Sequence, residues 1–340
     1  MIFVTGATGL VGSHLLLDLL QQGEQVRALK RPLSNIQQVL KTFRWYTPDA
    51  EVLFNQIEWV DGDLLDIYGL EELLTGVDTI YHSAAMVSFR TADRAAMLTN
   101  NVEGTSNLVN AALIKGVRKM CHVSSVAALG KTKNGEQVTE ETNWIPGRQI
   151  SSYSESKFFS EMEIWRGVEE GIESVVVNPS IIIGPGNWQT GSTAFFGVVN
   201  RGLNFYTGGT TGYVSVRDLT RAMLMLMSPT YFETTKNQRF ILSAENISYR
   251  EFFRKVASAL NRPEPKIYAS PLMLSLAWRT AGAIALLTGK APIVTRETAQ
   301  SAHTITEFDG SKISRLTSFE YSDLSDVIEA TAQRFLEDHP

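Results

Sequence analysis

A tyrosine and a lysine one helical turn apart are the side chains best placed for acid–base chemistry. Tyr153 and Lys157 lie in the segment SSYSESKFFSE, and their spacing puts both on one face of a helix. A tyrosine ordinarily titrates near pH ~10, too high for efficient proton exchange at neutrality. A lysine ammonium one turn away stabilises the phenolate and lowers that pKa. We therefore expect Tyr153 to act as a general acid in carbonyl reduction or as a base in alcohol oxidation.

Two serines at the end of an apolar run offer a hydroxyl to this pair. Ser124 and Ser125 follow the run KMCHV, and alternation along a strand sends them to opposite faces, so only one can face a substrate. Ser152 and Glu155 have the spacing of a capping box. This spacing predicts that the helix carrying Tyr153 begins at Ser152.

A glycine loop at the start of the chain indicates a second site. The segment VTGATGLVG (4–12) lies between an apolar run and an amphipathic stretch. Gly6 would permit the tight turn, Gly9 would let the backbone approach a pyrophosphate, and Gly12 would let the helix pack closely on the strand. The free N–H groups and dipole of a helix start favour an anion. The loop therefore predicts dinucleotide binding.

These segments require a sheet to position them. Short apolar or β-branched runs alternate with helical patterns over the first 180 residues, which argues for a doubly wound α/β fold with a parallel sheet covered on both faces. Such sheets bind ligands beyond the carboxyl ends of their strands. The runs are residues 2–5, 25–30, 57–62, 77–84, 119–125 and 174–180. After residue 180 the pattern becomes irregular, with long loops expected over 184–213 and a polar C-terminal helix from Asp323.

Composition excludes several classes of function. The net charge of −5 gives no electrostatic reason to expect a nucleic-acid partner. The single Cys121 suits a reducing cytoplasm, and no signal peptide is expected. The apolar stretch 270–289 is interrupted by Arg279 and falls short of the ~18–20 apolar residues of a membrane span, so we expect a buried or substrate-facing helix, with an interfacial lid as the alternative. The five histidines lack ligand spacing, and no metal site is expected.

The motifs together resemble the extended short-chain dehydrogenase/reductase family. T-G-x-x-G-x-x-G at the N-terminus, GDL (62–64), NNVEGT (100–105) and Y-x-x-x-K occur in the family's order. The resemblance selects Ser125 as the catalytic hydroxyl beside Tyr153 and Lys157, assigns Asp63 to the adenine, and gives Asn101 a role in bracing the active-site strands. The implied cofactor-binding residues are Gly6, Thr8, Gly9, Leu10, Val11, Gly12, Arg31, Asp63, Leu64, Ala84, Ala85, Tyr153, Lys157, Pro179 and Ile182.

The resemblance also implies a domain organisation. It predicts a Rossmann-type NAD(P)-binding domain over residues 1–183, to which about 214–245 return. Residues 184–213 and 246–320 would form a smaller substrate-binding region, and 321–340 a C-terminal helix. A homodimer is the family default.

The end of the second predicted strand bears on cofactor choice. It reads ALKRPLSN, with Lys30 and Arg31 and no nearby acid. A guanidinium binds a 2′-phosphate in bidentate fashion, whereas a carboxylate would repel it, so NADP(H) is expected. NAD(H) stays possible, because an arginine can also lie over adenine.

The remaining motifs narrow the reaction. The run IIIGPGNW lacks the arginine common in nucleotide-sugar enzymes, and Ser125 is followed by Val126 and Ala127 rather than an Asp-Glu pair. The chain is thus most similar to the dihydroflavonol reductase and 3β-hydroxysteroid dehydrogenase branch, which implies a bulky, largely apolar ketone or secondary alcohol. An NAD-dependent nucleotide-sugar epimerase or dehydratase and a non-catalytic dinucleotide sensor are the alternatives. Candidate substrate contacts are Met86, Trp188, Phe195, Phe196 and Tyr206, with Phe205 and Trp278 beside them.

Overall fold

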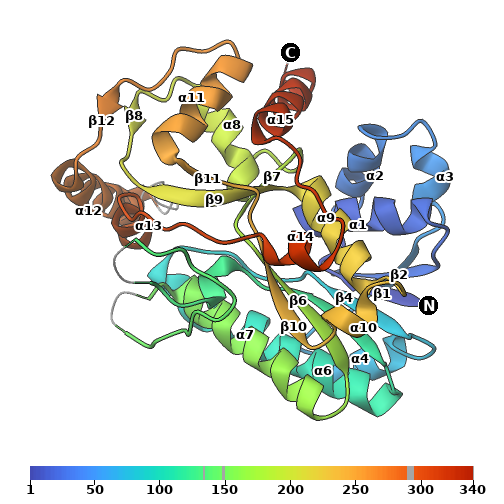
Figure 1. Cartoon of the computed structure of the whole chain (residues 1–340). Coiled ribbons are helices and arrows are strands. Elements are labelled where there is room, and N and C mark those ends of the chain that lie inside the picture. Colours follow the sequence, from blue (N-terminus) through green and yellow to red (C-terminus); the bar gives the residue numbers. More distant parts are fainter. Residues whose placement is uncertain (133–134, 148–149, 289–294, 340) are drawn as a thin grey trace.

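Seven parallel strands form the central sheet, in the order β10-β6-β5-β4-β1-β2-β3 (Figure 1). The computed structural model describes residues 1–132, 135–147, 150–288 and 295–339. The strands are β1 (Ile2–Thr5), β2 (Val26–Lys30), β3 (Glu58–Asp61), β4 (Thr79–His82), β5 (Lys119–Val123), β6 (Glu173–Pro179) and β10 (Gln238–Leu242). Each of the six runs expected from the sequence overlaps one of them. The doubly wound α/β fold is confirmed.

Helices cover both faces of this sheet (Figure 1). On one face lie α1 (Leu10–Gln21), α2 (Gln37–Arg44), α3 (Ala50–Phe54), α9 (Val216–Met227) and α10 (Phe232–Thr235). On the other lie α4 (Ile67–Leu73), α6 (Gly104–Lys115) and α7 (Ser152–Glu169). Between β4 and α6 the chain forms α5 (Arg94–Met97) and a π-helical segment (Leu98–Glu103). Gly116 ends α6 in the left-handed conformation, at φ 71°.

The later part of the chain adds two small sheets beyond the carboxyl ends of the strands. One has the order β11-β9-β7, with β7 (Ile181–Ile183), β9 (Thr210–Ser215) and β11 (Glu245–Ser248); the other pairs β8 (Phe205–Tyr206) with β12 (Ile267–Tyr268). The helices are α8 (Ala194–Asn200), α11 (Tyr249–Ala259), α12 (Pro271–Thr288), α13 (Arg296–Ser301), α14 (Lys312–Leu316) and α15 (Leu324–Asp338). The expected loops at 184–213 were therefore partly wrong, because AFFGVVN forms α8. The helix expected from Asp323 is α15, with Asp323 as its N-cap.

Charged side chains and a glycine cover the outer edge of β10. Glu140 accepts the backbone N–H of Ile241 at 2.9 Å, and Lys312 donates to the carbonyl of Arg239 at 2.8 Å. A Cβ on Gly310 would lie 2.2 Å from the Ser243 carbonyl, so only glycine lets this segment approach so closely. Two hydrogen-bonding groups on the outer edge of this strand are thus paired within the chain.

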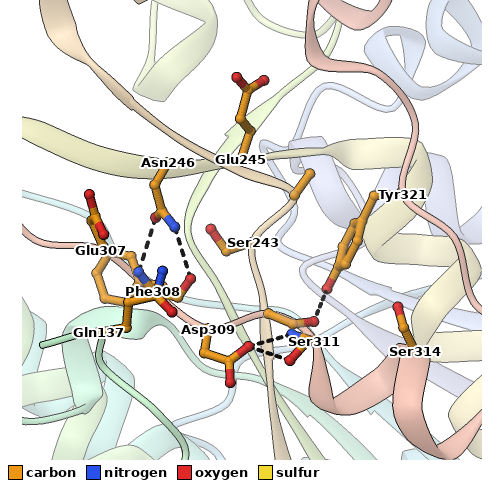
Figure 2. Close-up of a pocket in the computed structure, with 12 residues that line it drawn as sticks. Gln137, Ser243, Glu245, Asn246, Glu307, Phe308, Asp309, Ser311, Ser314 and Tyr321 are labelled. Atoms are coloured by element: carbon orange, nitrogen blue, oxygen red, sulfur yellow. Dashed lines mark hydrogen bonds between the residues drawn. The ribbon is translucent and has the colours of Figure 1, made fainter.

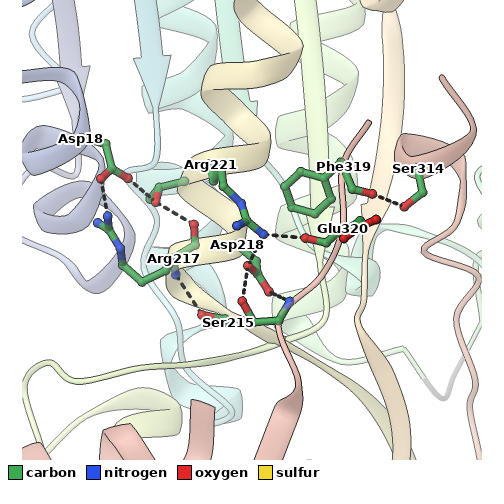
Figure 3. Close-up of polar contacts among 10 residues, drawn as sticks. Asp18, Ser215, Arg217, Asp218, Arg221, Ser314, Phe319 and Glu320 are labelled. Atoms are coloured by element: carbon green, nitrogen blue, oxygen red, sulfur yellow. Dashed lines mark hydrogen bonds and ion pairs between the residues drawn. The ribbon is translucent and has the colours of Figure 1, made fainter. Parts of the chain in front are cut away.

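Polar contacts fix α9 between α1 and the segment before α15 (Figure 3). Asp18 of α1 pairs with Arg217 at 2.6 Å and accepts from Thr220 at 2.6 Å. Asp218, in the first turn of α9, accepts the Ser322 N–H at 2.8 Å and its hydroxyl at 2.9 Å. Asp218 therefore has a structural role. The division into a cofactor-binding domain and a substrate-binding region stays a prediction.

Candidate active site

The glycine loop joins β1 to α1 in a conformation that side chains would obstruct. Gly6 has φ 67°, and a Cβ there would lie 2.6 Å from the Ala84 backbone N. A Cβ on Gly12 would lie 2.2 Å from the Gly6 carbonyl oxygen. Gly9 is the exposed N-cap of α1, no side chain caps this helix start, and its first turn has no acid. These features fit an anionic group at the helix N-terminus.

At the ends of β2 and β3, the adjacent basic residues Lys30 and Arg31 differ in whether they have a carboxylate partner. Lys30 pairs with Asp61 at 2.5 Å. Arg31 is exposed, and within the described residues its guanidinium forms no ion pair. Asp63 is exposed in the next turn, where one carboxylate oxygen accepts the Leu65 N–H at 3.0 Å. Of the two basic side chains, Arg31 is the one left without a carboxylate partner.

The other predicted cofactor residues lie at the same edge of the sheet. Ala84 follows β4 and packs against Gly6, while Ala85 is exposed beside it. Pro179 ends β6, and Ile182 lies in β7, where its carbonyl accepts from the Ser192 hydroxyl. Because parallel strands end at one edge, these residues lie at the same edge of the sheet as the glycine loop. Thr8, Leu10 and Val11 of the loop and the start of α1 are partly buried, as is Leu64 after β3.

Ser125, Tyr153 and Lys157 meet where β5 ends against α7. Ser125 lies beside Tyr153, and its Oγ accepts the Ala127 N–H at 3.1 Å. Burial raises the pKa of Tyr153 above its ordinary value, and the hydrogen bond with Ser125 opposes that shift. Lys157 is 2% exposed, and its ammonium donates to the Val123 carbonyl at 2.8 Å. Burial lowers the pKa of Lys157 to about 8.

The structure differs from the expected pKa of Tyr153. The sequence predicted a lowered pKa, whereas burial raises the pKa of this phenol. Tyr153 and Lys157 are one turn apart, yet the ammonium is directed at the Val123 carbonyl. A protonated phenol is thus the resting form of this site.

The start of α7 also differs from expectation. Ser151 caps the helix, accepting the Ser154 N–H at 3.0 Å, so the capping box expected at Ser152 and Glu155 is wrong by one position. Three serines near the helix start all have capping chemistry, and only Ser151 has the extended backbone that a cap needs. Glu155 instead pairs with Arg94 through two hydrogen bonds, of 2.7 and 2.9 Å. Tyr153 and Lys157 still occupy the first two turns.

A buried polar network supports the site from beneath. Ser124 faces away from Ser125, as strand alternation predicts, and its hydroxyl donates to Glu161 at 2.6 Å. Asn178 of β6 donates to Glu161 at 2.8 Å and to the Ser125 carbonyl at 3.0 Å. Arg239 lies 3.3 Å from the other oxygen of Glu161. This network holds the backbone of Ser125 and compensates the buried carboxylate.

Two histidines extend the polar layer across β4 and β5. The ring nitrogens of His82 hydrogen-bond Thr5 at 2.7 Å and Thr105 at 2.9 Å, and burial lowers the pKa of His82 to about 3. The His122 ring lies 5.0 Å from that of His82. Within the described residues neither nitrogen of His122 has a partner, and burial lowers its pKa well below the ordinary value. Both imidazoles are therefore neutral near pH 7.

Two side chains at the site were missed in the sequence. Glu297 of α13 lies 3.4 Å from both the backbone N and the hydroxyl of Ser152, at the start of α7. The Phe89 ring lies 5.8 Å from that of Tyr153. Glu297 is 145 positions from Ser152, and no local pattern signals such a contact. Asn101, expected to brace strands, instead binds both backbone groups of Met86, at 2.7 and 2.9 Å.

The structure does not gather the five predicted substrate contacts in one place. Met86 is held by Asn101 after β4, whereas Phe196 is fully buried and packs on Trp188 and Phe335 of α15. The Trp188 indole donates to Asp338 at 2.7 Å. Phe195 packs on two phenylalanines of α11, and Tyr206 on Tyr268. Trp188 and Phe196 thus have a packing role between α8 and α15.

A polar cleft of 510 Å³ lies apart from these residues, along β11 and the segment before α14 (Figure 2). None of the predicted site residues lines it. Its polar groups hold the chain together: Asn246 binds both backbone groups of Phe308 at 3.0 Å, and Tyr321 donates to Gly310 at 3.0 Å. In the described part of the chain, no cluster of His, Cys, Asp and Glu could hold a metal ion. No helix there is long and apolar enough to cross a membrane.

Comparison with known proteins decides the family. The model of the "NAD dependent epimerase/dehydratase family" matches residues 2–235. The chain belongs to this family. It is 32% identical over 319 residues to a putative dihydroflavonol 4-reductase of Synechocystis, covering 91% of this chain and 87% of that protein. It is also 28% identical to sterol demethylase protein B of Methylococcus capsulatus, covering 80% and 78%. The crystal structure of gox2253 superposes with a TM-score of 0.80 at 28% identity, covering 100% and 98%.

These likenesses confirm the resemblance seen in the sequence. The chain is a member of the extended short-chain family with relatives named as reductases and dehydrogenases, and we classify it as an NAD(P)-dependent oxidoreductase. NAD is the cofactor in the family's name. The finer assignments, of substrate, cofactor preference and individual residues, follow as proposals.

Proposed function

We propose that the protein transfers hydride between NADP(H) and a ketone or secondary alcohol of a bulky, largely apolar small molecule, with Tyr153 as general acid/base. The observation that carries the proposal is the placement of Ser125 beside Tyr153 at the carboxyl end of β5, with Lys157 of the same helix bound to the Val123 carbonyl. That position faces the ligand-binding edge of a doubly wound sheet. The uncapped start of α1 at the same edge suits the pyrophosphate.

The reaction needs a proton donor at the oxygen of the substrate. When bound, the reduced nicotinamide supplies the hydride that forms the new C–H bond. Tyr153 donates its phenolic proton to the carbonyl oxygen as negative charge develops there. Ser125 Oγ already accepts the Ala127 N–H, so its own proton is free to hydrogen-bond the same oxygen. Lys157, while protonated, stabilises the phenolate left on Tyr153 until solvent returns a proton.

The surroundings of Tyr153 support an apolar substrate. Phe89 packs edge-on against the phenol and is 42% exposed, so part of its ring is available to a ligand. Relatives of the chain are named for flavonol, sterol and cinnamoyl-CoA chemistry. A screen of aromatic and alicyclic ketones and alcohols with each nicotinamide, followed at the absorbance of the reduced cofactor, tests this class.

Replacement of the phenol tests the catalytic assignment. In Tyr153→Phe we expect kcat to fall at least about a thousandfold, because general acid catalysis is lost with its hydroxyl. Cofactor affinity, measured by fluorescence titration with NADPH, should change less than about threefold. Retained turnover would show that another group handles the proton. Tyr68→Phe, an exposed tyrosine on α4, is the matched control.

Arg31 is proposed to bind the 2′-phosphate of NADP(H). Its guanidinium lacks an ion-pair partner among the described residues, whereas Lys30 is paired with Asp61. In Arg31→Ala we expect the Kd for NADPH to rise about ten- to a hundredfold, the effect of losing one charge-assisted bidentate contact. The Kd for NADH should change little. Equal weakening of both cofactors would contradict the assignment.

The same experiments separate reduction from epimerisation. An epimerase holds its NAD throughout the cycle and returns the hydride to the substrate, so added NADPH would not be consumed. Dinucleotide found in the purified protein, together with turnover of a nucleotide sugar and no net oxidation of NADPH, would replace the proposed reaction with that one.

A further inference from the structure

The end of the molecule that carries α12 exposes an unusual concentration of large apolar side chains. We call this surface the apolar face; it consists of Phe205, Ile267, Tyr268, Leu272, Met273 and Leu276. Leu272 is 81% exposed and Leu276 65% exposed. Strands β8 and β12 pair with each other, with Ile267 opposite Phe205, and only Ala269 and Ser270 separate β12 from α12, so the six residues come from adjoining segments of the fold (Figure 1). A patch of this kind marks an interaction surface.

The charges around the apolar face indicate what covers it. The chain has a net charge of −5, yet it contains no aspartate or glutamate from residue 265 to residue 296. This stretch instead carries the basic residues Lys266, Arg279, Lys290 and Arg296. Lys266 and Arg279 are exposed, and Arg250 lies 4.7 Å over the ring of Tyr206 at the edge of the face. Exposed apolar side chains flanked by cations are suited to an anionic lipid surface.

A second copy of the chain fits this surface less well. A symmetric contact would place each basic flank opposite that of its partner, since a two-fold interface uses the same patch on both subunits. Glu264 and Glu297 are the acidic residues at the two ends of the stretch 265–296. Glu264 is exposed, and Glu297 is directed at the start of α7. Anionic headgroups would instead pair with Lys266 and Arg279 while Leu272 and Leu276 enter the acyl boundary.

We propose that the apolar face docks the protein peripherally on anionic phospholipid membranes. Helix α12 lies along the surface and does not cross it, consistent with the lack of a spanning helix among the described residues. Through α12 the face adjoins α13, whose Glu297 contacts the catalytic helix. Docking thus places the substrate side of the active site next to the lipid. The proposal concerns binding and stands whether or not the proposed reaction is correct.

Vesicle flotation of the full chain tests the proposal. We expect the protein to float with vesicles of equal parts phosphatidylglycerol and phosphatidylcholine, and at least about tenfold less with phosphatidylcholine alone. Binding should weaken as salt is raised. Leu272→Glu combined with Leu276→Glu should lower the partition coefficient to anionic vesicles at least about tenfold, because it places charge in the apolar contact.

A matched pair of substitutions controls for added charge. Ile114→Glu with Val52→Glu changes two apolar side chains that are each 61% exposed and lie on α6 and α3. We expect this pair to bind vesicles nearly as the parent does, apart from the small effect of net charge. Circular dichroism verifies that both double variants are folded. The double variant Lys266→Gln, Arg279→Gln loses two positive charges with little change in side-chain size, and it should lose the preference for anionic lipid.

Three results would overturn the proposal. The first is that the parent protein fails to float with anionic vesicles at low salt. The second is that the Leu272→Glu, Leu276→Glu variant floats as well as the parent protein. Alternatively, light scattering detects a dimer that the same variant dissociates while vesicles remain unbound, in which case a second copy covers the face.

Discussion

The two faces of the central sheet bury different chemistry beneath the carboxyl ends of the strands. Toward α1 and α9 the buried strand residues are apolar along their length, including Val4, Tyr81, Cys121, Val123, Val175 and Val177. Toward α6 and α7 the buried residues of β1, β4, β5 and β6 are apolar only near the amino ends, where Phe3, Ile80, Met120 and Val176 lie. Farther along this second face the buried strand residues are Thr5, His82, His122 and Asn178. Parallel strands covered on both faces are usually apolar throughout, so this half-face is the exception.

The difference separates the sheet face that stabilises the fold from the sheet face that lies beneath the candidate active site. The polar half-face lies beneath Ser125, Tyr153 and Lys157, and it includes a buried ammonium, a buried carboxylate and two neutral imidazoles. Burial of each such group costs free energy unless it is fully paired. The sheet face toward α1 and α9 has no such groups on its strands and holds the sheet to these two helices. Substitutions on the two faces should therefore affect different observables.

The largest expected effect is on turnover, from the polar half-face. In Lys157→Met we expect kcat to fall by about three orders of magnitude, because the charge that stabilises the phenolate is lost. Stability should be unchanged or slightly higher at pH 7. Moving the pKa of Lys157 from 10.5 to about 8 corresponds to about 3 kcal/mol against the folded state, which offsets the lost hydrogen bond to Val123. Steady-state kinetics and urea unfolding measure both effects, and Lys115→Met on the exposed side of α6 is the control.

A substitution in the core between α9 and the sheet should have the opposite effect: a loss of stability without a loss of turnover. Leu226 of α9 is fully buried in the cluster between α9 and the sheet. In Leu226→Ala we expect the free energy of unfolding to fall by about 2–5 kcal/mol, because removal of the buried side chain beyond Cβ leaves a cavity that the surrounding residues fill only in part. Below its melting temperature the variant should keep its kcat. A tenfold loss of kcat without loss of stability would contradict the different roles assigned to the two faces of the sheet.

Acid should lower the stability of the fold mainly through the polar half-face. This effect should be smaller than the two described above. Burial depresses the pKa of His82 and His122 in the folded state, so the unfolded chain binds more protons below its ordinary pKa of ~6.5. Stability contributed by the neutral rings is present above that pH and is lost as the pH falls. Each ring contributes about 1.4 kcal/mol per pH unit. His122→Leu should reduce the slope of stability between pH 6 and pH 5 by about that amount; an unchanged slope, measured by urea unfolding, would contradict its neutral state.

Much of the fold and part of the site followed from local pattern. The six apolar runs overlap β1 to β6, and the helix expected from Asp323 is α15. Strand and helix periodicity is a local property, which is why these predictions were confirmed. The capping error at Ser152 arose because adjacent serines share one chemistry and only backbone conformation selects among them. The assignments of Ser125, Tyr153, Lys157 and the glycine loop to catalysis and cofactor binding stay predictions.

The remaining features depend on contacts that no local pattern encodes. Glu297 meets the start of α7 only because the chain after α12 returns there, and Asn178 acquires its role from Glu161 on a different element. The aromatic residues of α8 were expected near substrate because of their position after the sixth strand. They pack on α11 and α15 instead, since apolar rings bury themselves wherever helices offer a core.

The covering of β10 has a consequence for how the chain reaches its folded state. Glu140, Gly310 and Lys312 close the strand from two segments that lie about a hundred and seventy positions apart, and one of them is near the C-terminus. During synthesis the first six strands and β10 emerge before Gly310 and Lys312 do. Through that interval the open edge can pair with another nascent chain. By covering this edge, the last thirty residues thus protect the protein from aggregation.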